Sequence, residues 1–477
     1  MLKVENLSVS FQDEIGNGAV VDNLSFSLEK GEILAIVGES GSGKSMTALS
    51  VIGLLKKTAR LKGKIMLEDV NLLTLNKKER RAYMGNEIAM IFQEPMTSLN
   101  PVMKVGKQAV EMLLLHKDIF PQKLSRKEMK KMVIDTFEQV DLPEPEKLYD
   151  KYPHELSGGM RQRVMIAMAT LCHPKILIAD EPTTALDVQT QEQIIGLLKR
   201  INQEKKISIL MITHDLNVVA DMADRIVVMH DGKKVEEGST NEVLTNPKEE
   251  YTKKLIASIP KGKKVAEEQA DDIIVKAEDL SIYYKEGRKK HFVIENLSFE
   301  IQKGEILGLV GRSGLGKTTI SKTILGIHKH YTGTLENHAK HSQMIFQDPF
   351  SSLNPSKTIG WILEEPLKIR ENLSAEERRK KVVQMLEKVG LGEEFLNRKP
   401  SALSGGQRQR VSIALSVISG ADFIIADEPV SALDVTIQAQ VLELLLGLQK
   451  EYGLSMLFIS HDIHVIEKMC DRILRID

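Results

Sequence analysis

The chain has 477 residues, of which 42% are hydrophobic and 27% are charged, and this composition predicts a globular protein of two or three domains rather than a disordered one. Its 65 basic and 66 acidic residues give a net charge of −1, so no global electrostatic attraction favours a nucleic-acid partner. Its two cysteines provide neither a disulfide framework nor a zinc or iron–sulfur ligand set, which favours a reducing cytosol.

Local charge and hydropathy exclude further classes. The basic runs at 77–81 and 378–381 lie beside acidic residues, which predicts solvated helix faces rather than a nucleic-acid site. The amino terminus has no secretory signal pattern, and no apolar run approaches the roughly 18 residues that span a bilayer. Any membrane role is therefore expected to be peripheral.

A phosphate loop follows the first predicted buried strand, at 33–37, and leads into a predicted helix. Residues 38–45 fit the pattern G-x-x-x-x-G-K-[ST] at every fixed position. In this motif backbone N–H groups turn inward on nucleotide phosphates, Lys44 reaches the β- and γ-phosphates, and the Ser45 hydroxyl can ligate magnesium. The loop consists of Gly38, Glu39, Ser40, Gly41, Ser42, Gly43, Lys44 and Ser45. The alternative is a glycine-rich turn without a ligand.

The same motif recurs after a second apolar run at 306–310. This loop consists of Gly311, Arg312, Ser313, Gly314, Leu315, Gly316, Lys317 and Thr318. The upstream segments 7–11 and 23–26 recur at the same spacing of 273 positions, at 280–284 and 296–299. A shared spacing over this length indicates an internal duplication and hence two related domains.

Between the two loops, a predicted strand at 88–92 ends at Gln93 and is followed by a proline-containing loop. From 103 to 141 the pattern is helical and amphipathic, which predicts a packed helical insert. Ser157, Gly158 and Gly159 then precede an apolar helical run at 164–169. A serine and bare backbone amides at a helix start form a second anion site.

Acidic residues and a histidine follow the next two predicted strands. The strand at 175–179 ends in Asp180 and Glu181, and the strand at 209–212 is followed by Thr213 and His214. The carboxyl ends of strands are where α/β sheets hold ligands. Taken singly, the two carboxylates could be a helix cap and the histidine a core residue.

In this order of motifs the chain resembles the nucleotide-binding subunits of ABC transporters. The second half repeats the order with Gln347, the signature Ser404, Gly405 and Gly406, then Asp427, Glu428 and His461. The resemblance implies an α/β fold of two tandem P-loop NTPase domains of the ABC type. Each would contain a RecA-like parallel-sheet core, an antiparallel β subdomain and a helical signature subdomain.

The residues that follow each glutamine indicate one subfamily within this family. Gln-Glu-Pro-Met-Thr-Ser-Leu-Asn-Pro at 93–101 and Gln-Asp-Pro-Phe-Ser-Ser-Leu-Asn-Pro at 347–355 are similar to the peptide and nickel importer subfamily, as is the tail at 246–260. The first signature ends in Met160 and the second in Gln407, which resembles two different ATPase partners of such importers. The chain therefore resembles both partners fused.

These patterns predict three segments. Residues 1–260 form the first nucleotide-binding domain with an importer-type tail at 232–260, and 273–477 form the second, which lacks that tail. Residues 261–272 are polar and without apolar periodicity, which predicts a flexible linker.

By resemblance, ATP and Mg²⁺ bind at two composite sites formed by head-to-tail pairing of the halves. Asp180 and Asp427 would hold the metal together with Ser45, Thr318, Gln93 and Gln347. Glu181 and Glu428 would orient or deprotonate the attacking water, and His214 and His461 would hold the γ-phosphate. The first loop would face Ser404, Gly405 and Gly406, and the second Ser157, Gly158 and Gly159.

Phe11 and Tyr284 occupy the positions where the family stacks an aromatic ring on adenine, although an aromatic near a strand end is otherwise more often a core residue.

The resemblance implies the ATPase of an importer of peptides or similarly sized solutes such as metal chelates. It would sit on the cytoplasmic face of the membrane with two permease subunits and, through them, an extracellular solute-binding protein. The alternative is a soluble tandem ABC ATPase acting on ribosomes, although such proteins carry a longer charged segment between the halves. A DNA-repair ATPase would need zinc-ligand cysteines, which the chain lacks.

Overall fold

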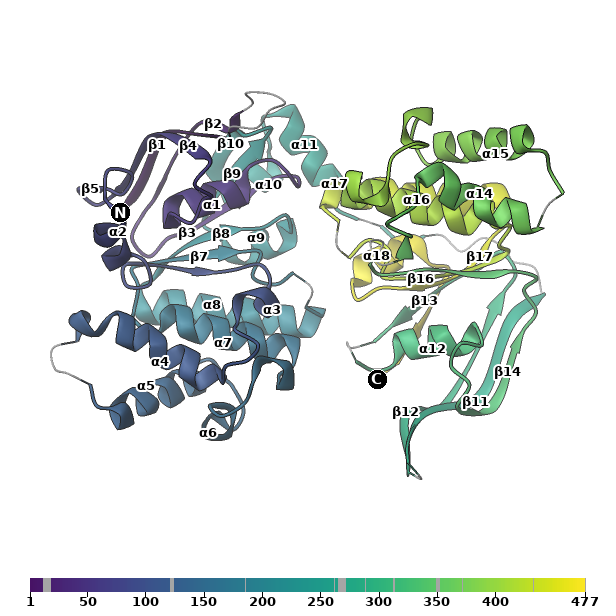
Figure 1. Cartoon of the computed structure of the whole chain (residues 1–477), viewed down its shortest axis with the longest axis horizontal. Helices are drawn as coiled ribbons and strands as arrows, with labels where there is room; N and C mark the ends of the chain where they lie inside the picture. The colour runs from purple at the N-terminus through teal and green to yellow at the C-terminus, as the bar shows by residue number, and fades with distance from the viewer. Residues whose placement is uncertain are drawn as a thin grey trace. The chain divides into compact units, whose positions relative to one another are not determined.

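The computed structural model describes residues 1–11, 19–120, 124–184, 186–260, 262–264, 272–287, 289–311, 314–348, 352–370, 372–431 and 433–476. The chain divides into two compact units, Met1–Ser258 and Ile259–Asp477 (Figure 1). Arg312 and Ser313 of the second phosphate loop and most of the predicted linker lie outside the described residues.

A six-stranded sheet with the order β10-β9-β3-β8-β7-β6 forms the centre of unit 1. All its strand pairs are parallel except β10 with β9. The central strands β3, β7 and β8 are buried along their whole length, as apolar strands covered on both faces must be. The strands are β3 (Ile33–Val37), β6 (Ile88–Ile91), β7 (Ile176–Asp180), β8 (Ser208–Ile212), β9 (Arg225–His230) and β10 (Lys233–Ser239). The predicted strands are thereby confirmed.

An antiparallel sheet with the order β2-β1-β4-β5 covers the phosphate-loop helix of unit 1. Its strands are β1 (Leu2–Phe11), β2 (Ala19–Leu28), β4 (Ala59–Leu67) and β5 (Val70–Asn71). Helix α1 (Lys44–Ile52) contacts strands of both sheets, and one hydrophobic core joins all three layers. The phosphate loop is therefore fixed at both ends, by β3 before it and by α1 after it.

The helical insert of unit 1 begins with two helices rather than one. Within the stretch predicted to be helical, α4 (Val105–Leu115) and α5 (Arg126–Gln139) are separate, and a capping box between Ser125 and Glu128 starts the second. The other helices are α2 (Lys77–Tyr83), α3 (Pro95–Ser98), α6 (Pro145–Leu148), α7 (Gly158–Thr170), α8 (Val188–Lys205), α9 (Leu216–Met222), α10 (Thr240–Thr245) and α11 (Glu250–Ala257), with 3₁₀ turns at Lys117–Ile119 and Pro153–Glu155. The basic helix α2 contains no buried residue, as predicted.

Unit 2 repeats these layers. A parallel sheet has the order β15-β16-β17-β13-β18, and an antiparallel sheet has the order β12-β11-β14. The strands are β11 (Ile273–Glu286), β12 (Lys289–Gln302), β13 (Ile306–Val310), β14 (Tyr331–Asn337), β15 (Ser342–Ile345), β16 (Phe423–Asp427), β17 (Ser455–Ile459) and β18 (Arg472–Arg475). The helices are α12 (Lys317–Ile324), α14 (Ile359–Arg370), α15 (Ala375–Lys388), α16 (Gly405–Ile418), α17 (Val435–Tyr452) and α18 (Ile463–Met469), with 3₁₀ turns at Glu393–Phe395 and Pro400–Ala402.

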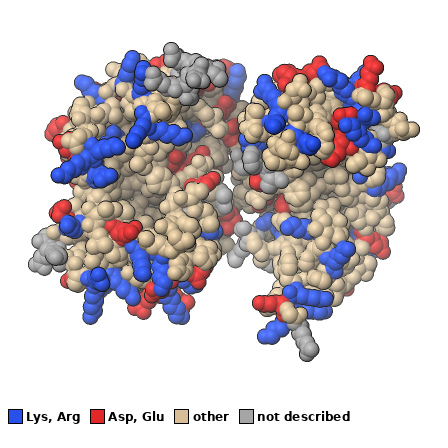
Figure 2. All heavy atoms as spheres, in the orientation of Figure 1, with Lys and Arg blue, Asp and Glu red and all other residues tan. Residues whose placement is uncertain are grey.

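Two hydrophobic clusters stabilise unit 2. One joins the antiparallel sheet, α12 and one face of the parallel sheet, and the other joins the opposite face to helices α14–α18. In the face drawn in Figure 2, basic and acidic side chains are interspersed over both units, in keeping with the near-zero net charge. Within the described ranges, no helix combines the length and the apolar character needed to cross a bilayer.

Two lysines of the predicted linker form ion pairs within unit 2. The Lys264 ammonium pairs with Asp471 at 2.8 Å, and its backbone N–H donates to the Glu467 carbonyl oxygen at 2.8 Å. The Asp471 side chain is 3% exposed and also accepts the backbone N–H of Ile306 at the start of β13. Lys263 pairs with the Glu467 carboxylate, but its side chain is 78% exposed.

We expect Lys264→Met to lower the local unfolding free energy around β13 and β18 by about 1–3 kcal/mol, because it deprives a buried carboxylate of its ionic partner. Hydrogen exchange of the backbone amides of these two strands in the full chain measures the effect. Lys263→Met is the matched control and should change exchange little, because exposed ion pairs contribute about 0–1 kcal/mol. Equal effects of the two substitutions would contradict this account.

Candidate functional site

The first phosphate loop is shaped by close packing at its start. Gly38 has φ of +151°, and a Cβ there would lie 2.1 Å from the Met229 carbonyl oxygen, so only glycine fits. The Lys44 ammonium is buried in the loop and donates to the carbonyl oxygens of Gly38 and Glu39, both at 2.7 Å. In unit 2, Lys317 donates to the Gly311 carbonyl oxygen at 2.6 Å. The first loop therefore curves around its own lysine at a helix N-terminus, which is an anion-binding arrangement, and the described residues of the second loop repeat the lysine contact.

An oxygen pair lies beside each loop. Ser45 Oγ donates to Asp180 Oδ1 at 3.1 Å, and Thr318 Oγ1 donates to Asp427 Oδ2 at 2.8 Å. Burial raises the pKa of Asp180 to about 6, with the neighbouring Glu181 charge adding to the effect and the Ser45 hydrogen bond opposing it. One hydroxyl and one carboxylate oxygen fit a hard cation that takes its remaining ligands from phosphate and water, as Mg²⁺ does.

Glu181 is the side chain on which the first site converges. Its Oε2 accepts hydrogen bonds from Gln93 Nε2 at 2.8 Å and Thr184 Oγ1 at 2.9 Å, and its Oε1 lies 3.1 Å from His214 Nδ1. These partners come from the ends of β6 and β8 and from the turn after β7. Glu181 has φ of +46°, a left-handed conformation that is uncommon for a non-glycine residue and is often found at functional sites.

Unit 2 builds the same arrangement around Glu428. Gln347 Nε2 donates to Glu428 Oε2 at 2.8 Å, His461 Nδ1 lies 3.4 Å from the same oxygen, and Glu428 has φ of +48°. One contact differs: Ser431, which aligns with Thr184, donates to the Glu428 backbone carbonyl oxygen instead of the carboxylate. The first glutamate therefore has one more side-chain donor in the described contacts.

Each glutamate and its histidine shift one another's pKa. Burial disfavours the charged form of both His214 and Glu181, but the hydrogen bond and charge attraction between them outweigh it. The pKa of the histidine is therefore raised above 6.5 and that of the glutamate lowered below 4.5. The same directions and causes hold for His461 and Glu428. Near neutral pH each glutamate is a charged, acceptor-rich carboxylate.

The signature serines are helix caps. Ser157 Oγ accepts the Met160 backbone N–H at the start of α7, and Ser404 Oγ accepts that of Gln407 at the start of α16, both at 3.3 Å. The Gln407 side-chain oxygen also accepts a hydrogen bond from the Ser404 backbone N–H, which completes a capping box. Met160 has no side-chain oxygen and cannot make this bond.

The second signature glycine is required by packing. A Cβ at Gly159 would lie 2.5 Å from Thr190, and one at Gly406 would lie 2.5 Å from Ile437. Gly158 and Gly405 have ordinary room for a Cβ, so packing does not explain why they are glycines.

The two aromatic candidates are placed differently. Phe11 is partly buried and packs against the core of unit 1. Tyr284 is 46% exposed, and its hydroxyl lies 3.3 Å from Thr319 Oγ1 on α12. The adenine-stacking role of both residues stays a prediction.

Sequence reasoning missed three features of these sites. The contact of Thr184 with Glu181 and the left-handed backbone of both glutamates have no motif of their own. Gln162, which is 2% exposed, donates to the Pro182 carbonyl oxygen and so ties the signature helix to the turn after Glu181. Its recurrence as Gln409 in the second signature helix could have drawn attention to it.

The fold and the two sites define a protein with two P-loop nucleotide-binding domains in one chain. The family model described as "ABC transporter" matches residues 21–184 and again 294–431. The chain belongs to this family, in the peptide-importer subfamily that its sequence indicated, and it is an ATPase of that family.

Curated relatives match over almost the whole chain. The peptidoglycan transport ATP-binding protein YejF of Agrobacterium fabrum is 41% identical, with 99% of this chain and 90% of the relative covered. The glutathione import ATP-binding protein GsiA of Escherichia coli is also 41% identical, with 99% of this chain and 84% of the relative covered. Both relatives are ATP-binding proteins of transport systems by name.

Solved tandem structures share the fold. An archaeal ribosome recycling factor, solved with a ribosomal stalk protein, has a TM-score of 0.67 at 22% identity, covering 98% of this chain and 86% of that one. The RNase-L Inhibitor has a TM-score of 0.66 at 23% identity, with coverages of 99% and 87%. At such identities the likeness establishes the α/β tandem fold alone.

We expect Glu181→Gln to lower the pKa of His214, because the amide removes the charge and the hydrogen bond that raise it while burial still disfavours the imidazolium. In the wild type the attraction is complete between about pH 4.5 and 6.5 and is lost as pH rises through the raised pKa of His214. NMR titration of the histidine rings measures both states. Glu428→Gln is the control, which should lower the pKa of His461 and leave His214 unchanged. A His214 pKa that does not move in Glu181→Gln would contradict the pairing.

Proposed function

We propose that this chain is the ATP-hydrolysing subunit of an importer of peptides or similarly sized solutes. The observation that carries the proposal is the same set of contacts in both units: a lysine bonded to its phosphate loop, a metal-type oxygen pair, and a partly buried glutamate that contacts a glutamine and a histidine. The solute class rests on the names of the 41% identical relatives, which handle glutathione and peptidoglycan. That whole-chain identity favours import over the ribosomal alternative.

In this proposal the residues act by position and charge. Lys44 and Lys317 turn from the loop carbonyls to the β- and γ-phosphates, while Ser45 with Asp180 and Thr318 with Asp427 hold Mg²⁺. Bound Mg²⁺ supplies neutralisation of the phosphate oxygens. Gln93 and Gln347 approach the same region from the ends of β6 and β15.

Glu181 and Glu428 orient the attacking water through a hydrogen bond and take its proton as it attacks. Because their pKa values are lowered, each carboxylate is a weak base, and the orientation contributes more than the basicity. His214 and His461, kept cationic by the glutamates to a higher pH than usual, donate to the γ-phosphate.

We further propose that the two halves pair head to tail. Ser157, Gly158 and Gly159 would then complete the site of Lys317, and Ser404, Gly405 and Gly406 that of Lys44. The support is that both signature serines lie at helix N-termini, where backbone N–H groups favour an anion. Tyr284, with its exposed ring, is proposed to stack on adenine.

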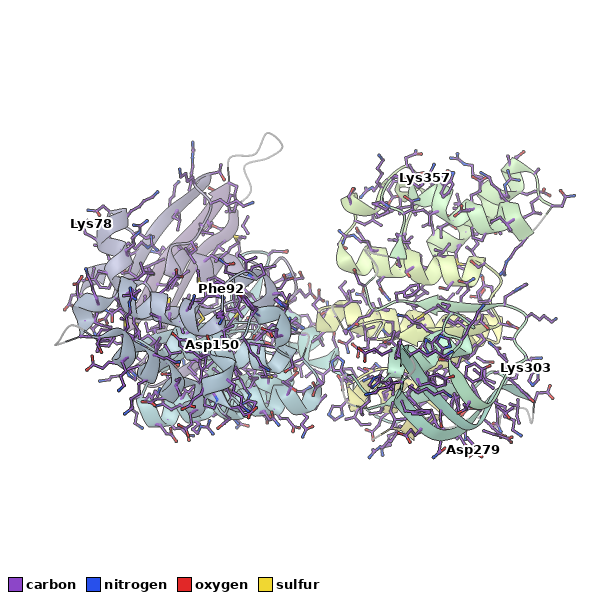
Figure 3. All side chains as sticks on the ribbon, turned by 60° about the horizontal axis from the view of Figure 1, so that its bottom comes forward. Lys78, Phe92, Asp150, Asp279, Lys303 and Lys357 are labelled. Carbon is purple, nitrogen blue, oxygen red and sulfur yellow. The ribbon has the colours of Figure 1, made fainter. Side chains whose placement is uncertain are left out.

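The proposed membrane partners are two permease subunits, each contributing a short helix to one half. In unit 1 a mainly apolar cavity of about 310 Å³ lies among β6, α4 and α7. One of its lining residues is Phe92, directly after β6, which is labelled in Figure 3. Leu54 and Leu115, which also line it, are 55% and 74% exposed, and their counterparts Ile327 and Ile369 are 64% and 78% exposed. Large apolar side chains exposed at matching positions of both halves favour a common docking mode.

The loop after each glutamine has both buried and exposed members. Leu99 and Leu353 are 3% and 2% exposed, so this leucine packs the insert in both units. Met96 and Val102 beside it are 51% and 82% exposed, and we assign them to the permease contact together with Leu115 in unit 1 and Ile369 in unit 2. The chain would then sit at the cytoplasmic face of the membrane, with a solute-binding protein on the far side.

Ser157→Arg should impair nucleotide handling at the Lys317 loop, because an arginine there would fill the space of a γ-phosphate held by the other half. Photolabelling with azido-ATP, followed by peptide mapping, assigns the defect to one half. Ser125→Arg, at the cap of α5, is a control for the helical insert away from the signature. Loss of labelling at the Lys44 loop instead would refute the head-to-tail arrangement.

Purification of the full chain from its native membranes in mild detergent should bring down two multispanning proteins. Replacing Leu115 and Ile369 by aspartate together should release both, since each would place a charge in an apolar contact. The double replacement of Lys263 and Lys303 by aspartate is the surface control. Co-purification with ribosomes and without membrane proteins would overturn the importer assignment.

A further inference from the structure

The first phosphate loop is in contact with the carboxyl-terminal tail of its own unit. The backbone N–H of Glu39, the second residue of the loop, donates to the Tyr251 hydroxyl at 3.2 Å. Tyr251 is the second residue of α11, more than 200 positions further along the chain. The tail therefore supplies a side chain to the nucleotide site.

Tyr251 is held firmly on both sides. Its ring stacks on His230 at the end of β9, with a centroid separation of 4.0 Å and an interplanar angle of 23°. The residue before His230 is Met229, whose carbonyl oxygen lies where a Cβ on Gly38 would have to fit. At the start of α11, Glu236 of β10 accepts the backbone N–H groups of Lys248 and Glu249 at 2.8 and 3.2 Å.

One peptide group links Tyr251 to the lysine of the first phosphate loop. The N–H of the Gly38–Glu39 peptide donates to Tyr251, and the carbonyl oxygen of the same peptide accepts from Lys44 Nζ at 2.7 Å. Hydrogen bonds in such a chain polarise one another, and fixing the N–H fixes the plane that carries the oxygen. The orientation of the peptide that holds the lysine thus depends on the tyrosine hydroxyl.

We propose that Tyr251 is a positioning residue for the first ATP site, through which the tail helix α11 controls the affinity of the Lys44 loop for ATP. The inference rests on the proposed ATPase function. Glu39 precedes the glycines that turn inward on the phosphates, so its N–H can keep the tyrosine contact while nucleotide is bound. Displacement of α11 would free the Gly38–Glu39 peptide group to rotate, and the loop would then hold Lys44 less firmly.

Tyr251→Phe removes the hydroxyl and keeps the ring on His230. In azido-ATP photolabelling of the full chain, we expect the ATP-analogue concentration for half-maximal labelling of the first half to rise roughly three- to tenfold, the effect of one lost hydrogen bond. Labelling of the second half is the internal reference and should not change. Amide exchange at Glu39 should become faster in the same variant.

Tyr152→Phe is the matched control, since Tyr152 also stacks on a histidine, His154, but lies in the helical insert. It should leave both halves as in the wild type. Unchanged labelling and unchanged Glu39 exchange in Tyr251→Phe would overturn the proposal and leave the ATPase function standing. Absence of labelling in both halves of the wild type would overturn the ATPase function and this proposal with it.

Discussion

In each unit polar side chains converge on one partly buried carboxylate, and this convergence determines how the site is built. Glu181 and Glu428 stand at the carboxyl ends of β7 and β16, where a negative charge is costly unless hydrogen-bond donors surround it. The donors come from neighbouring parallel strands, because only strands that run the same way end at one edge of the sheet. The phosphate loop at the end of β3 or β13 then shares this edge. A parallel sheet is thus the condition for bringing residues 88 positions apart, such as Gln93 and Glu181, within 2.8 Å.

The sequence motifs predicted which residues gather at this edge of the parallel sheet, but not their local conformation or their individual contacts. The phosphate loops, Gln93, Asp180 and His214 could be placed because each follows a short apolar run whose end is visible in the sequence. The left-handed backbone of Glu181 could not, since φ depends on how the following turn packs and glutamate has no preference for that region. Contacts made by single side chains over long separations, such as Lys264 with Asp471, leave no periodic signal.

The two halves are duplicated but not equivalent in the described contacts. Thr184 binds its glutamate where Ser431 binds backbone, and Gln407 completes a capping box that Met160 leaves open. These differences lie around the shared machinery and leave the lysine, glutamine, aspartate, glutamate and histidine of both sites in place.

The most direct test of the account is the steady-state ATPase rate of the full chain with Glu181→Gln and Glu428→Gln introduced singly, alongside ATP binding. The amide keeps the shape of the carboxylate but cannot accept the proton of the attacking water. The account predicts that each substitution lowers turnover strongly while ATP binding is retained. A turnover rate unaffected by either single substitution would contradict the claim that both glutamates are catalytic.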